Sequence, residues 1–177
     1  AQFKTRNGRI VLDGGGIKPD VLLPHDTAAG VVKALLDQNI IFDFVTDFTL
    51  KNAKIDSVET FEFTDFDGFA KYVQSKNFDY QTATEKKINE LRDVAARESL
   101  PLNNEIAGLE NKIKAEKKGE LSKNRDRILH EIEQDIVGRY YFQRGKVRKN
   151  LVNDPEVKEA IKLLNDSERY NGILSGK

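Results

Sequence analysis

Apolar residues recur at helical spacing along most of this chain. Phe66, Phe69 and Val73 stand at positions i, i+3 and i+7, which places them on one face of a helix. Ala70 joins that face at i+4. Similar spacing in six further stretches predicts a mainly α fold. Those stretches are residues 28–36, 40–48, 82–100, 102–117, 121–145 and 154–164. The β-branched residues of 40–48 leave a strand as an alternative there.

Polar residues at the ends of these stretches predict where several helices begin. Thr82 and Glu85 have the spacing of a capping box. Asp154 followed by Pro155 predicts an N-cap with proline in the first turn. The remaining caps are expected at Asp26 or Thr27 and at Thr64.

The pattern also predicts how some helices pack. Lys117-Lys118-Gly119 interrupts the periodicity, and the stretches on either side of Gly119 are expected to pair as an antiparallel hairpin. We therefore expect a multi-helix domain of helical hairpins. A buried stripe in the last long helix is expected at Val157, Ala160, Ile161 and Leu164, followed by a docking segment with Tyr170, Ile173 and Leu174.

The first 25 residues follow a different pattern, in which turn residues separate short extended runs. Asn7-Gly8 predicts a two-residue hairpin turn between two strands, and residues 21–23 predict another short strand. Because the glycines at 14–16 lead into an extended run, we interpret them as a structural turn and not a phosphate-binding loop. We expect a β-element over residues 1–25 and a helical domain over residues 26–177.

Composition narrows the function classes. The chain is 38% hydrophobic and 33% charged, a polar balance that suits elongated amphipathic helices. Its 29 basic and 29 acidic residues cancel, which argues against a dedicated polyanion binder. The absence of cysteine excludes disulfides and thiolate metal sites. No run approaches 18 apolar residues, so no membrane span is expected.

Spacing does not support a metal or nucleophile site. His25 and His130 have no partner at metal-ligand spacing. Residues 65–68 fail as a calcium loop because Phe63 and Gln74 would stand where carboxylate ligands are needed. We therefore predict no metal, no cofactor and no hydrolysis by this chain alone. The serines that lack the setting of a nucleophile turn are Ser57, Ser75, Ser99, Ser122, Ser167 and Ser175.

Residues 139–149 carry five basic residues, three aromatic residues and no acid. Such a stretch could hold single-stranded nucleic acid by phosphate contact and base stacking. It could equally be the end of a helix, where cations complement the dipole and aromatic rings enter the core. The acidic residues just upstream, such as Asp135, favour the second interpretation. The candidate surface consists of Arg139, Tyr140, Arg144, Lys146, Arg148 and Lys149.

Residues 3–23 resemble a segment of the tail-specific (carboxy-terminal processing) serine proteases. In that family a stretch of the form Tyr-x-Thr-Pro-x-Gly-Arg-x-Ile, followed by Gly-x-Gly-Ile-x-Pro-Asp, lies shortly downstream of the catalytic lysine. Arg6 stands where the family often has proline. The residues that match are Thr5, Gly8, Arg9, Gly14, Gly16, Ile17, Pro19 and Asp20.

The helical region is similar to the C-terminal extension of the longer tail-specific proteases of Bacteroidetes-type bacteria. It shares Arg139-Tyr140 and the helix start at Asp154-Pro155. It also shares a late Tyr-x-x-Ile-Leu, here residues 170–174. Together the two resemblances cover most of the chain.

The resemblance implies a function for the intact protein. The family's nucleophilic serine and base lysine precede the matching segment, so we expect a non-catalytic C-terminal fragment bounded at Ala1 within a longer protein. The parent would cleave proteins of the cell envelope near their C-termini by a Ser/Lys dyad without a cofactor, in the periplasm or cell envelope.

The role of the helical part stays open among three possibilities: support of the catalytic core, positioning of protein substrates, or self-association as a homo-oligomer. Two alternatives from other classes also stay open. One is a freestanding helical protein-interaction module, and the other is a weak nucleic-acid binder that uses residues 139–149.

Overall fold

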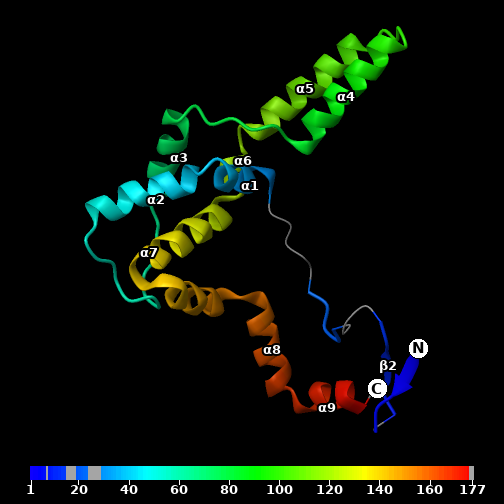
Figure 1. The fold of residues 1–177 in the computed structure, drawn as a ribbon, viewed down its shortest axis with the longest axis vertical. Helices are drawn as coiled ribbons and strands as arrows, with labels where there is room; N and C mark the ends of the chain where they lie inside the picture. The colour runs from blue at the N-terminus through cyan, green and yellow to red at the C-terminus, as the bar shows by residue number, and fades with distance from the viewer. Residues whose placement is uncertain (7, 15–18, 24–28, 176–177) are drawn as a thin grey trace. The chain divides into compact units, whose positions relative to one another are not determined.

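Helices account for most of the chain in the computed structural model, which describes residues 1–6, 8–14, 19–23 and 29–175 (Figure 1). A small antiparallel sheet precedes them, so the expected mainly α fold with an N-terminal β-hairpin is confirmed. The strands are β1 (Gln2–Lys4) and β2 (Ile10–Leu12). The helices are α1 (Gly30–Asp37), α2 (Ile40–Lys51), α3 (Phe66–Ser75), α4 (Ala83–Arg97), α5 (Asn103–Lys117), α6 (Glu120–Lys123), α7 (Arg125–Asn153), α8 (Pro155–Asn165) and α9 (Ser167–Ser175).

The chain divides into two units. The larger unit is Thr27–Lys149, and the smaller unit combines Ala1–Asp26 with Asn150–Lys177. The division predicted from the sequence, a protease-edge element over residues 1–25 and a helical domain over residues 26–177, stays a prediction.

The core of the larger unit brings the first half of α7 together with α1, α2 and α3. Ile128, Ile132 and Ile136 stand at helical spacing on one face of α7, and their side chains are fully buried. They share one apolar cluster with Leu35 of α1 and Val45 of α2. Because removing such side chains from water contributes about 1.5–3 kcal/mol each, this face of α7 is a main source of stability.

Aromatic rings complete the core beside α2. Phe44 packs edge-on against Phe63, Phe69 and Tyr72, with ring centroids 5.7, 5.1 and 5.2 Å apart. Phe63 belongs to the segment that connects α2 and α3. The segment forms no strand, yet Phe61 and Phe63 are buried in the same cluster.

α4 and α5 form an antiparallel helical hairpin (Figure 1). Arg92 of α4 pairs with Glu110 of α5 across it. The hairpin expected around Gly119 is wrong, because the chain reverses earlier, in the loop between α4 and α5. Pro101 lies in that loop, where its missing N–H and fixed φ oppose a continuous helix.

α7 consists of two arms, residues 125–141 and 143–153, joined by a bend at Phe142. Lys149 on the second arm pairs with Glu133 on the first at 3.3 Å. In a straight helix these residues would be about 24 Å apart along the axis, so the chain turns back at the bend. The helix expected to end near Gly145 therefore continues through the second arm.

α8 begins as predicted. The Asp154 carboxylate accepts hydrogen bonds from two backbone N–H groups of the first turn, at 2.7 and 3.0 Å, and Pro155 opens the helix. The predicted buried stripe is wrong, because none of the described side chains of α8 is buried. Ile161 and Leu164 are 53% and 66% exposed.

The starts of α4 and α3 can be compared with the predicted N-caps. Thr82 and Glu85 make both hydrogen bonds of the capping box, which is confirmed. Asp65, and not Thr64, caps α3 by accepting the Gly68 N–H at 2.9 Å. α1 begins at Gly30, and the caps expected at residues 26–27 lie outside the described residues.

The β-hairpin closes differently from the predicted two-residue turn. Thr5 N–H donates to the Arg9 carbonyl at 2.8 Å, and Gly8 N–H donates to the Thr5 carbonyl at 2.9 Å. Gly8 has a φ of 82°, as in a three-residue loop that ends in a left-handed residue. Asn7 lies outside the described residues, and residues 21–23 form no strand.

We predict that Ile132→Ala will lower the free energy of unfolding of the chain by about 2–5 kcal/mol, because it leaves a cavity in the core. Ile161→Ala, on the exposed stripe, is the matched control and should change stability by less than about 0.5 kcal/mol. Urea denaturation followed by circular dichroism measures both. Equal losses for the two variants would contradict this assignment of the core.

Candidate functional site

The motif residues of the N-terminal hairpin form a local structural cluster. Arg9 donates to the Asp20 carboxylate, and Thr5 Oγ1 accepts the Arg9 N–H at 3.2 Å. The hydrogen bond from Arg9 lowers the pKa of Asp20 below its ordinary value. The cluster ties the loop of the hairpin to the segment that follows it.

The remaining motif residues are placed only in part. Gly14 has a φ of 86°, a backbone angle that favours glycine. Pro19 belongs to neither a helix nor a strand. Gly16 and Ile17 lie outside the described residues. A functional role for the motif in this chain stays a prediction.

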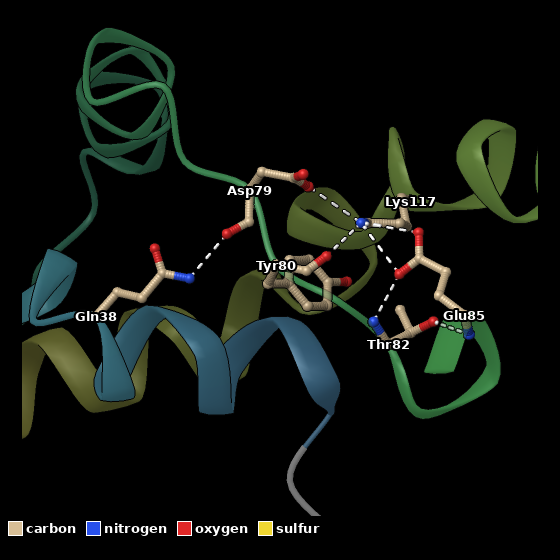
Figure 2. A network of polar contacts seen from close by, with 6 residues as sticks. All are labelled: Gln38, Asp79, Tyr80, Thr82, Glu85 and Lys117. Carbon is tan, nitrogen blue, oxygen red and sulfur yellow. Dashed lines mark hydrogen bonds and ion pairs between the residues drawn. The ribbon is translucent and has the colours of Figure 1, made fainter. Parts of the chain in front are cut away.

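A second polar cluster lies at the base of the α4–α5 hairpin, around Lys117 (Figure 2). Its ammonium group lies 3.1 Å from the Asp79 carboxylate and 3.2 Å from that of Glu85. It also donates to the Tyr80 carbonyl and lies 4.6 Å from the centre of the Tyr80 ring. Gln38, which follows α1, donates to the Asp79 carbonyl at 2.8 Å. The cluster therefore joins the end of α5, the start of α4 and α1.

Glu85 carries two tasks in this cluster. Its carboxylate accepts the Thr82 N–H at 2.6 Å, which completes the capping box, and it faces Lys117. Partial burial pushes the pKa of Glu85 upward, but hydrogen bonds from Thr82 and Lys117 outweigh it, so the pKa lies below the ordinary value. Glu85 is therefore held as a carboxylate.

An open hollow of about 850 Å³ adjoins this cluster. Phe78 and Tyr80 stack on one another in its wall, with centroids 5.6 Å apart. Its charges are mixed, because Lys114 and Lys118 line it together with Asp79 and two glutamates. The hollow has the room for a ligand, but its balanced charge selects neither an anion nor a cation.

The basic strip predicted over residues 139–149 is largely paired with acids of the same unit. Arg139 and Lys146 face the Asp135 carboxylate at 3.6 and 3.5 Å. Arg148 pairs with Glu59, while Arg144 is exposed. These pairs leave few of its cations for phosphate groups.

The aromatic residues of the strip divide between core and surface. Tyr140 packs against the apolar cluster, and its hydroxyl donates to the Asn52 carbonyl. Tyr141 donates to the Asp56 carbonyl at 3.0 Å. Phe142 is 76% exposed, so the expectation that these rings all enter the core is wrong for Phe142.

Lys149 was predicted as part of this surface, but it is buried. Only 6% of its side chain is exposed, and it pairs with Glu133, of which 15% is exposed. Lys149 also donates to the Phe61 carbonyl, and Glu133 accepts the Phe63 N–H at 2.9 Å. Sequence reasoning missed this pair, because the 16-residue separation places the partners together only if α7 bends.

No group of three or more histidine, cysteine, aspartate or glutamate side chains among the described residues is arranged to hold a metal ion. Ser75 and Ser175 donate to the carbonyls of Tyr72 and Gly172, which are local helix contacts. Of the helices in residues 29–175, none is long and apolar enough to cross a membrane.

A comparison with protein families matches most of the chain. The model described as "Probable PDZ-protease, C-terminal helical domain" matches residues 31–164. The matched range runs from α1 into α8 and includes the whole core of the larger unit. Neither the curated proteins nor the solved structures contain a match.

We predict that Glu85→Gln will cost about 1 kcal/mol of unfolding free energy at pH 7, since glutamine keeps the cap but loses the charge facing Lys117. A lowered pKa in the fold stabilises the protein above the ordinary value of 4.5 and loses that contribution as pH falls through the folded value. The difference between wild type and variant should therefore hold from pH 7 to about 5 and shrink below 4.5. Denaturation curves that stay parallel down to pH 3 would contradict it.

Proposed function

Since the chain belongs to the family of C-terminal helical domains of probable PDZ-proteases, we propose that it is the non-catalytic part of a tail-specific serine endopeptidase. The family match supports the protease origin, and the hairpin motif over residues 3–23 supports the tail-specific class. The parent would cut other proteins near their C-termini with a Ser/Lys dyad that lies outside this chain. Its place would be the periplasm or cell envelope.

For the helical part itself, we propose that it supports the catalytic core by docking against it. The observation that carries this proposal is the uncovered stripe on α8, where Ile161 and Leu164 are more than half exposed. Tyr170 and Leu174 of α9 are also exposed, at 39% and 46%. Apolar side chains repeated at helical spacing are costly to leave in water and are typical of a surface that another protein covers.

The other roles have weaker support. Self-association could cover the same stripe, and substrate could lie in the hollow beside Lys117, but neither has a contact that favours it. Nucleic-acid binding through residues 139–149 is disfavoured, because Arg139, Lys146, Arg148 and Lys149 face carboxylates within the larger unit. A freestanding interaction module would not need the hairpin motif.

We predict that the purified 177-residue chain will leave an unstructured peptide with an apolar C-terminus intact. Ser75 and Ser175 donate to helix carbonyls, a contact that does not activate a hydroxyl as a nucleophile. Mass spectrometry of the peptide over several hours measures cleavage. The intact parent protease is the positive control and should cleave the same peptide.

Turnover by the chain alone that a serine-directed reagent blocks would overturn the non-catalytic assignment. Turnover that the reagent does not block would be traced to contamination by repeating the assay after a further purification step.

A further inference from the structure

The bend of α7 holds a residue in an unfavourable backbone conformation. Phe142 has a φ of 58° and a ψ of −162°, a region that is otherwise used almost only by glycine. Its ring is 76% exposed, so burial of the side chain does not offset the strain. Other contacts must therefore hold the bend.

Those contacts lie where the second arm returns to the first. Lys149 and Glu133 form a nearly buried pair at 3.3 Å, and each has a further backbone partner in the segment of Phe61 and Phe63. Removing one member of such a pair leaves the other charge buried and unpaired, which is strongly unfavourable. The pair therefore acts as a lock on the bent form.

Close packing at the bend adds to the lock. A side chain at Gly145 would collide with Cβ of Tyr141, and it would lie 3.1 Å from Val137. Glycine at this position thus lets the second arm approach the first. Both arms are helical up to the bend itself, so only Phe142 must change its dihedral angles for α7 to become one straight helix.

We propose that α7 is a two-state element, bent in the structure and straight in a minor form. Backbone strain at Phe142 favours the straight form, and the Lys149–Glu133 pair with its bonds to residues 61–63 favours the bent form. A partner that binds one form better shifts the balance toward it. This conformational device is independent of the function proposed above.

The absence of cysteine in the chain makes a distance measurement direct. Asp126 on the first arm and Val147 on the second are exposed, and each is replaced by cysteine. A spin label is attached to each cysteine, and pulsed electron–electron double resonance measures the distance between the two labels. A straight helix separates these positions by about 32 Å, and the bent form brings them much closer. We expect a main short distance and a minor population near 32 Å.

Substitutions should move these populations in opposite directions. Lys149→Met should raise the long-distance population several-fold, because it breaks the lock. Phe142→Gly should reduce it, because glycine tolerates the bend. Arg144→Met is the matched control: Arg144 lies on the same arm as Lys149 but is exposed, so this variant should leave the distances unchanged.

A single short distance in all of these variants would overturn the proposal. A broad distribution with loss of helical circular dichroism in Lys149→Met would overturn it too, because the released arm would then unfold and not straighten. If Lys149→Met does not fold, the melting temperatures of Phe142→Gly and Phe142→Ala still test whether the backbone at the bend is strained. The glycine variant must melt several degrees higher than the alanine variant, and equal melting temperatures would contradict strain at the bend.

Discussion

The structure depends on one apolar face of α7. Ile128, Ile132 and Ile136 are fully buried there, and α1, α2 and α3 gather around them in a single cluster. This contact holds the three N-terminal helices, which end by Ser75, against a helix that begins only at Arg125. The larger unit therefore has a core of its own. The range matched by the family model includes every buried residue of that core.

The rest of α7 shows how tertiary contacts override local preference. Phe142 has an unfavourable backbone conformation, and the bend that it makes lets Lys149 contact Glu133 and the carbonyl of Phe61. The basic strip takes its form from the same bend, because turning back brings its cations close to acids of the first arm and of the connecting segments. A stretch that looks like a binding surface in the sequence is thus largely an internal set of ion pairs.

Much of the fold could be predicted from periodicity and caps, because these depend on neighbours within one or two turns. The face of Phe66, Phe69 and Val73 and the start of α8 are of this kind. The bend, the α4–α5 pairing and the exposure of Ile161 could not be predicted, because they depend on which distant surfaces meet. The Lys117 cluster was missed for the same reason: its partners come from separate segments, and only the capping box at Glu85 left a signal.

We propose that α8 carries a surface that the rest of the intact protease covers. Hydrogen–deuterium exchange with mass spectrometry, on the 177-residue chain and on the intact protease, tests it most directly. In the chain alone, amides of the first arm of α7 should exchange slowest and those of α8 quickly, since Ile161 and Leu164 are exposed. In the intact protease, α8 should slow by tenfold or more. Equal exchange of α8 in both proteins would contradict the claim.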